Sequence, residues 1–390
     1  MNPSSSGWIK KLLKEIGSNH PFLSYDEDRF YHDLRYCGFI YGSNLTVVSE
    51  VTDKKDLTEE EICKVNLCLA FYYTYRKSDS EIYFIDSVIN FYKSINETKT
   101  SFFEDFLIGK KSSDQLEKII HKRIQIDANI ITKNFNYFII NALLFVDVLA
   151  YKKYLEDHTI SIDYLKNIEA AIGSISLSVL NSKVIKNQYD ESLIKLFESS
   201  LRYQDNTHLS YKTAISYIKS KHEKYYILDL ACMATWTDAV IDFGEEHFLK
   251  KLGKGLKLES SVILNSINTI NTFYTNNKDN ISLLSSKNIV QSFYNNSSKM
   301  VVKLISRNRK RLYQELKDSK ELMVLLTQST VRDLNKEEQK KVQEQLLDIF
   351  KSIPSLAIFM LPGGALLLPL VVKFIPKLLP SAFDENRIED

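Results

Sequence analysis

The chain has 390 residues, with 51 Lys and Arg against 49 Asp and Glu, a formal net charge of +2. This near balance excludes a general polyanion binder, and no DNA partner is expected, because such proteins carry a strong basic excess. Hydrophobic residues make up 44% of the chain, which excludes a disordered protein. Only 11 Gly and 7 Pro are present, and five prolines lie in the last forty residues, so the composition predicts long helices before that point.

The first 17 residues predict a short amphipathic helix. Trp8, Ile9, Leu12, Leu13 and Ile16 fall on one helical face, with lysines elsewhere. Such a helix either lies on a membrane surface or docks on its own domain, and docking is the commoner arrangement. No long apolar run follows the lysines, so we expect no secretory signal and a cytoplasmic N-terminal body.

Two patterns predict buried helices between residues 58 and 157. Thr58, with Glu61 three positions later, has the capping-box pattern of a helix start. The run FNYFIINALLFVDVLAYKKYL, at 135–155, is strongly apolar. Its uncharged part, from Asn134 to Val146, is shorter than the ~20 residues that a membrane span needs, so a core helix is predicted. Four cysteines lack Cys-x-x-Cys spacing and are expected to be buried, reduced thiols: Cys37, Cys63, Cys68 and Cys232.

The sequence lacks the common motifs of catalytic and cofactor sites. It contains no phosphate-binding loop, dinucleotide-binding glycine pattern, zinc-protease motif or nucleophile elbow. The seven histidines are scattered and include no pair spaced four residues apart. A non-enzymatic protein without a cofactor is therefore predicted.

Residues 225–258 predict a helix, a turn and a second helix, in which Asp242 is the N-cap and Glu245 the third residue. The pattern of Asp238, the sequence Val-Ile-Asp ending at Asp242, Glu245 and then Phe-Leu resembles the tellurite-resistance TerB family of small all-helical domains. The resemblance implies a weak Ca²⁺ or Mg²⁺ site at Asp238, Asp242 and Glu245. The simpler alternative is that Asp242 and Glu245 only cap the helix, because a calcium site needs six or more oxygen ligands.

A basic cluster precedes the last predicted helices: Arg307, Arg309, Lys310 and Arg311. These side chains either contact anionic lipid head groups or RNA, or form an ordinary solvated face. Further on, Asn335 and Glu338 have capping-box spacing. An apolar stripe follows them at helical spacing: Val342, Leu346, Ile349, Phe350 and Ile353.

The run Ile353–Val372 contains twenty residues and no charge, which is the length of a membrane span. The residues that we expect to define this segment are Ile353, Pro354, Phe359, Pro362, Gly363, Gly364, Leu368, Pro369 and Val372. An interior proline costs about 3 kcal/mol in a soluble helix, so a span would be kinked or broken at Pro362-Gly363-Gly364. A membrane-inserted segment is favoured, and the alternative is a soluble helical hairpin that turns at these glycines.

Residues 312–384 resemble the leucine zipper/EF-hand-containing transmembrane (Letm) family of inner-membrane proteins. The resemblance rests on LYQELKDSKELMVLL, on LNKEEQKKVQEQLLDIFKSIP and above all on PLVVKFIPKLLPSAF, which ends at Phe383. It implies a membrane segment at about Ile353–Val372. It also implies a role in potassium/proton or calcium/proton exchange, in membrane organisation, or in ribosome binding through the soluble part after the span.

These patterns predict an all-α protein with an N-terminal helical domain at 1–205, a TerB-like unit at 206–280 and a Letm-like region at 281–390. The expected location is a membrane, the inner membrane in a bacterium, with a cytoplasmic N-terminal body. One span forms no pore alone, so the expected partners are the lipid bilayer and a second copy or a membrane partner protein. The predicted function is cation/proton homeostasis or membrane organisation; the alternatives are a cytoplasmic interaction scaffold and a ribosome-binding protein.

Overall fold

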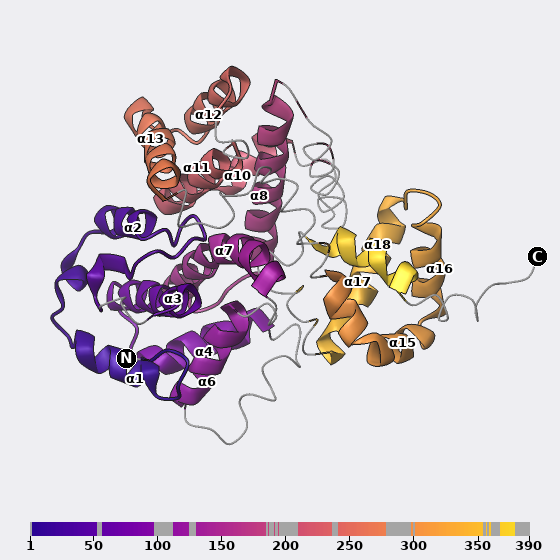
Figure 1. The fold of residues 1–390 in the computed structure, drawn as a ribbon, viewed down its shortest axis with the longest axis horizontal. Coiled ribbons are helices and arrows are strands. Elements are labelled where there is room, and N and C mark those ends of the chain that lie inside the picture. Colours follow the sequence, from indigo (N-terminus) through magenta and orange to yellow (C-terminus); the bar gives the residue numbers. More distant parts are fainter. Residues whose placement is uncertain are drawn as a thin grey trace, which may run out of the picture. The chain divides into compact units, whose positions relative to one another are not determined.

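A computed structural model describes residues 2–52, 57–96, 112–124, 130–184, 186, 191, 194, 210–235, 241–277, 298, 301–353, 356, 359 and 367–378. Within these residues every regular element is a helix and none is a strand, which confirms the predicted all-α fold (Figure 1). The chain divides into two compact units. Unit 1 comprises Met1–Leu165, Lys219–Met233 and Leu258–Ser285, and unit 2 comprises Lys166–Ile218, Ala234–Lys257 and Ser286–Asp390. Each unit combines segments that are far apart in the sequence. The three predicted domains, in contrast, follow one another along the chain, and this division stays a prediction.

Unit 1 is built around the long buried helix α3. Its helices are α1 (Trp8–Ile16), α2 (Glu27–Tyr36), α3 (Glu59–Arg76), α4 (Phe84–Asn96), α6 (Ser112–Ile124), α7 (Ile130–Asp157), α11 (Lys221–Thr235) and α13 (Ser260–Asn277), with short 3₁₀ turns at Pro21–Ser24 and Val48–Glu50. The Thr58–Glu61 capping box starts α3 as predicted. Helix α3 packs on α6 and α7, and α7 lies beside it in Figure 1. Phe71 of α3 contacts the rings of Tyr92 and Tyr151, so α4 and α7 share this aromatic core.

The N-terminal helix docks on its own unit, as the commoner alternative predicted. The side chains of Trp8, Ile9, Leu12 and Ile16 are buried, and α1 packs against α6. The carboxylate of Glu117 on α6 accepts hydrogen bonds from the backbone N–H groups of Gly7, at 3.0 Å, and Ile9, at 3.1 Å. Burial raises the pKa of Glu117 more than these bonds lower it. The apolar face of α1 is therefore covered by protein.

Two buried ion pairs join the helices of unit 1. Arg35 of α2 holds Asp229 of α11, with 2.7 Å between Nε and Oδ2 and 2.8 Å between Nη2 and Oδ1. Arg123 of α6 holds Asp147 of α7, with 2.7 Å between Nε and Oδ2. A tyrosine hydroxyl donates to each aspartate: Tyr31 to Asp229 and Tyr92 to Asp147. These bonds satisfy carboxylates whose burial would otherwise be costly.

Unit 2 contains α8 (Ile162–Ser182, of which the first residues belong to unit 1), α10 (Tyr211–Tyr217), α12 (Phe243–Gly255), α15 (Arg309–Lys317), α16 (Lys320–Gln328), α17 (Lys336–Ser352) and α18 (Leu368–Leu378). The ring of Tyr211 packs edge-on against Phe248, which joins α10 to α12. The four predicted thiols all lie in described parts of the chain, where they are buried and not joined in disulfides, as expected.

Candidate functional site

The last four described helices form a small bundle, which we call the C-terminal module (α15–α18). Helix α16 packs on α15, α17 and α18, and α15 also packs on α17. The stripe predicted on α17 is buried throughout: Val342, Leu346, Ile349, Phe350 and Ile353. Leu312 and Leu316 of α15 and Leu326 of α16 are fully buried as well. The module therefore has an apolar core built from its own helices.

The start of α17 is held by the predicted capping box. The side chain of Asn335 accepts a hydrogen bond from the backbone N–H of Glu338 at 3.0 Å, and the Glu338 carboxylate accepts one from the N–H of Asn335 at 2.8 Å. Arg332 donates to the same carboxylate at 2.6 and 2.8 Å. The bond from Arg332 is the main cause that lowers the pKa of Glu338 to about 2, so this carboxylate is charged under all ordinary conditions.

The described residues of the predicted membrane segment do not form one helix. Ile353 ends α17 with extended backbone angles, and α18 begins only at Leu368. Leu356, Phe359, Leu368 and Val372 are all buried, and the Phe359 ring lies 5.3 Å from that of Phe350 on α17. Pro369 stands in the first turn of α18, where a proline removes no helical hydrogen bond. Among the described residues of 353–372, only those from Leu368 onward belong to an α-helix, so the described part of this run is not one continuous helical span.

Four of the predicted segment residues lie outside the described part of the chain: Pro354, Pro362, Gly363 and Gly364. The predicted turn at the two glycines therefore stays a prediction. Among the residues that the structure describes, none of the helices combines the length and the apolar character that crossing a bilayer requires.

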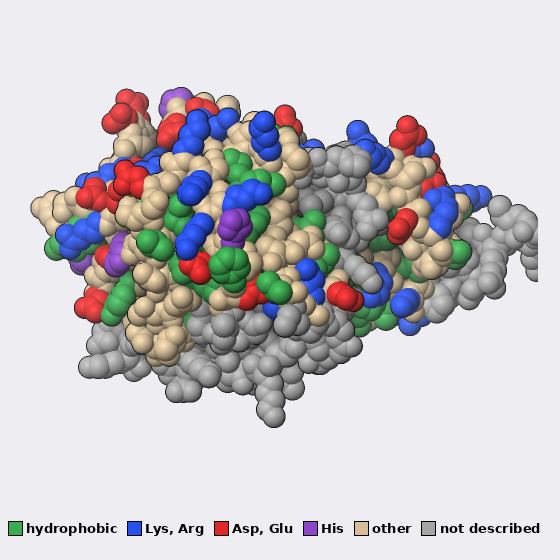
Figure 2. All heavy atoms as spheres, turned by 90° about the horizontal axis from the view of Figure 1, so that it is seen from above, with side chains coloured by type: hydrophobic (Ala, Val, Ile, Leu, Met, Phe, Trp, Pro, Cys, Tyr) green, Lys and Arg blue, Asp and Glu red, His purple; other side chains and the backbone are tan. Residues whose placement is uncertain are grey.

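The four basic residues of the predicted head-group or RNA contact are exposed in the structure: Arg307, Arg309, Lys310 and Arg311. Arg311 also donates a hydrogen bond from Nη2 to the carbonyl oxygen of Ser352, at 3.3 Å, so it links α15 to the end of α17. On the face drawn in Figure 2, Lys and Arg side chains are interspersed with Asp and Glu, as the net charge of +2 leads one to expect. A run of five residues with four positive charges is therefore a distinctive local feature.

The acidic residues of the TerB-like pattern are explained by helix capping where the structure describes them. One oxygen of Asp242 accepts from the backbone N–H of Glu245 and the other from that of Val184, each at 2.8 Å. Burial raises the pKa of Asp242, but these N–H groups lower it more, so the net shift is downward. Asp238 lies outside the described residues. Within the described part of the chain, no three potential metal-ligating side chains come together, and the divalent site stays a prediction.

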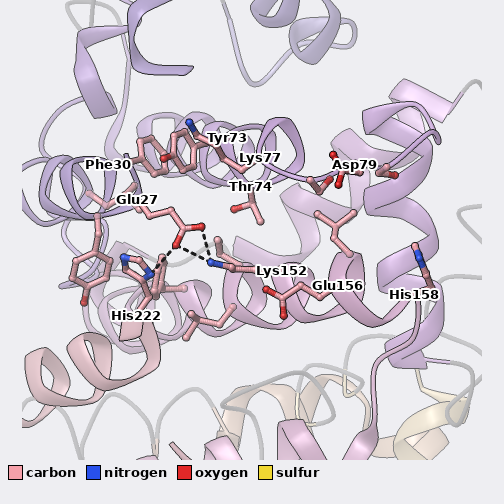
Figure 3. A pocket seen from close by; sticks show the side chains of 18 residues that line it. Glu27, Phe30, Tyr73, Thr74, Lys77, Asp79, Lys152, Glu156, His158 and His222 are labelled. Carbon is pink, nitrogen blue, oxygen red and sulfur yellow. Dashed lines mark hydrogen bonds and ion pairs between the residues drawn. The ribbon is translucent and has the colours of Figure 1, made fainter. Parts of the chain in front are cut away.

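Sequence reasoning missed a pocket in unit 1. It is a partly open cavity of about 420 Å³ between α2, α3, α7 and α11. At one end, Lys152 donates from Nζ to both carboxylate oxygens of Glu27, at 2.6 and 2.8 Å (Figure 3). Nδ1 of His222 lies 3.2 Å from the same carboxylate, and its Nε2 lies 3.3 Å from Asp28. No local motif marks these residues, because three different helices supply them.

The electrostatics of this cluster keep Glu27 ionised. The hydrogen bond with His222 is the largest cause, burial opposes it, and Lys152 lowers the pKa further, so that the pKa of Glu27 falls to about 2. The imidazole of His222 also packs against the rings of Tyr31 and Tyr225. The cluster is thus one charged end of a pocket that apolar side chains of α2 and α7 also line.

Comparison with known proteins gives one family match. Residues 334–390 match the family model described as "LETM1-like, RBD". This range begins at the residue before the α17 cap, includes α18, and overlaps the Letm resemblance seen in the sequence. No curated protein and no solved structure matches the chain. The TerB resemblance stays a prediction.

Proposed function

We propose that this chain is a non-enzymatic, Letm-like interaction protein whose C-terminal module binds the ribosome. The observation that carries the proposal is the match of residues 334–390 to the LETM1-like RBD model, on a segment whose described residues fold with their apolar side chains buried. The Letm resemblance implies ribosome binding as one activity of that family. The proposal transfers this activity to the module.

Burial of the apolar residues favours a polar partner for the module. Leu368, Leu370, Val371 and Val372 of α18 face the core, so they are not available on the surface of the folded module. The surface instead offers the basic cluster at 307–311. Ribosomal RNA presents closely spaced phosphates, and contacts from Lys and Arg to phosphates release counterions on binding. Binding through this cluster should therefore weaken steeply as salt rises.

Sedimentation with purified ribosomes tests the proposal. The full chain should pellet with ribosomes at roughly 50 mM salt and less at roughly 200 mM. The triple variant Arg307→Gln, Arg309→Gln, Lys310→Gln should bind more weakly, and the slope of log K against log salt should fall by about 2–3. Arg311 is left in place because it bonds to Ser352. Absence of the wild-type chain from ribosomal fractions at low salt would reject the proposal.

The matched control removes three lysines from α1: Lys10→Gln, Lys11→Gln, Lys14→Gln. These side chains are exposed and carry the same total charge as the three that are changed at 307–310. Binding by this control should equal that of the wild type. An equal loss of binding in both variants would show that only the total charge matters, and it would exclude a specific role for the C-terminal module.

The second candidate function is cation/proton homeostasis or membrane organisation at a bilayer, with a second copy or a membrane partner protein. The specific observation in its favour is the run of twenty uncharged residues at Ile353–Val372. For this function the apolar side chains of α18 would have to leave the core of the module and enter lipid. Alkaline carbonate washing of membranes tests it: retention of the full chain supports this candidate, and complete release rejects it.

A further inference from the structure

We propose that the pocket of unit 1 binds a small amphipathic carboxylate, with its apolar body on the pocket floor and its anionic head at Lys152. This site is separate from the C-terminal module and adds a ligand to the proposed function. It stands on three observations: the composition of the floor, the arrangement of charges at one end, and the exposure of the remaining charged groups at the rim.

The floor of the pocket, its most buried part, is apolar. It is formed by Leu34 of α2 and by Phe145, Val148 and Leu149 of α7, which are all at least 94% buried yet line the cavity. A cavity of this size and lining is typical of sites for small molecules with a hydrophobic body. A hydrocarbon chain or a ring placed there would be removed from water without the loss of any polar contact.

The charged end of the pocket favours an anionic head. Both oxygens of Glu27 already accept hydrogen bonds from Lys152, so a cationic ligand would have to displace that ammonium group. An ammonium group has three donor hydrogens, and Lys152 directs two of them to Glu27, which leaves one for a ligand carboxylate. Figure 3 shows Lys152 and His222 on the same side of the cavity as Glu27.

The charges around His222 extend this preference. Its ring faces Glu27 and Asp28 from α2, with Lys152 of α7 and Lys221 of α11 bound to the same two carboxylates. Two tyrosine rings, those of Tyr31 and Tyr225, complete its surroundings. Both carboxylates that face the ring are thus already paired with a lysine, which limits their repulsion of an anionic head group.

The other charged groups that line the pocket stand at its rim. Lys77, Asp79, Glu156 and His158 are exposed, and Figure 3 shows Asp79 and His158 at the end opposite Glu27, with Glu156 closer to Lys152. Charges exposed to solvent are screened far more than the half-buried pair of Glu27 and Lys152. The inner end therefore determines which sign of head group the pocket prefers.

Calorimetric titration of the full chain with octanoate tests the proposal. Octanoate should bind with one site per chain. Lys152→Met should weaken binding by about tenfold or more, and Lys152→Arg should retain most of it. Lys153→Met is the matched control, because Lys153 lies next in the same helix but pairs with Asp157 outside the pocket. It should bind as the wild type does.

Two further measurements separate this proposal from trivial explanations. Val148→Phe fills the floor and should abolish binding, provided that its circular dichroism and melting temperature show a folded protein. Octylamine has the same chain with the opposite charge and should bind more weakly than octanoate. Absence of octanoate binding, equal binding by Val148→Phe in its folded state, or tighter binding of octylamine would each overturn the proposal.

Discussion

Arg35 and Asp229 lie 194 residues apart in the sequence and meet in the core of unit 1 as a two-point ion pair. The same guanidinium donates to the hydroxyl of Ser266 on α13, at 2.8 Å. One side chain of α2 thereby joins two helices that come much later in the chain. Since the pair is buried, removal of either partner leaves an uncompensated charge or donor inside the protein.

Asp229→Ala should therefore destabilise unit 1 by about 3–5 kcal/mol, since it strands the Arg35 guanidinium in the core. Urea denaturation followed by circular dichroism measures the change. Glu321→Gln is a suitable comparison, because Glu321 pairs with Lys341 at 2.7 Å on the exposed surface of unit 2. The comparison variant should lose far less stability than Asp229→Ala, because an exposed ion pair is screened by solvent. Equal losses in the two variants would contradict the energetic role of burial.

Gly38 follows α2 and cannot accept a side chain. Its φ angle is +86°, and a Cβ atom there would lie 1.8 Å from the backbone oxygen of Ser43. Gly38→Ala should cost more than about 2 kcal/mol, from the left-handed backbone and the steric clash together. Gly7→Ala is the matched control: its φ is +89°, but nothing lies within 4 Å of the added atom. The control should lose only about 1 kcal/mol, and a similar loss at both sites would refute the clash.

The stability that Glu27 contributes should depend on pH at the acidic end. Its pKa is lowered from 4.5 to about 2 in the folded protein, first by the hydrogen bond with His222. A carboxyl group whose pKa is lower in the folded than in the unfolded state stabilises the folded protein at pH values above its unfolded-state pKa. This contribution is lost as the pH falls toward the folded-state pKa. The melting temperature of the wild type should thus exceed that of Glu27→Gln at about pH 5 and approach it near pH 2–3. A difference that does not shrink on acidification would contradict this.

Asn335 should contribute measurably to the C-terminal module. Asn335→Ala removes the acceptor for the backbone N–H of Glu338 and should destabilise the module by about 1 kcal/mol. Asn335→Asp retains a capping oxygen and should keep most of the stability. Hydrogen exchange of the first-turn amides of α17 reports on the cap directly. Unchanged exchange in the alanine variant would show that the cap is dispensable.

The local features of the fold were predictable because their causes lie within a few residues. The capping boxes at Thr58, Asp242 and Asn335 each join residues three positions apart, and all three are confirmed. The apolar stripe of α17 follows the helical period and is buried as expected. In these cases a short stretch of sequence contains both partners of each interaction.

Features that depend on distant residues were not predictable. The pocket cluster takes Glu27, Lys152 and His222 from three helices, and no spacing in the sequence connects them. The uncharged run at 353–372 posed a different problem. Its composition indicates that these side chains are removed from water, but a lipid bilayer and a protein core are both apolar environments that can achieve this. In the described residues, Phe359 and Leu368 are covered by protein.

The pairing of Arg35 with Asp229 also constrains the order of events during synthesis. At a synthesis rate of about 5–20 residues per second, roughly 10–40 s pass between the synthesis of Arg35 and that of Asp229. During that interval α2 has neither its counter-ion nor the hydroxyl of Ser266. The first unit of this protein is thus completed late in translation, and its unfinished core is exposed to aggregation or chaperone capture until the segment around α13 has left the synthesising machinery.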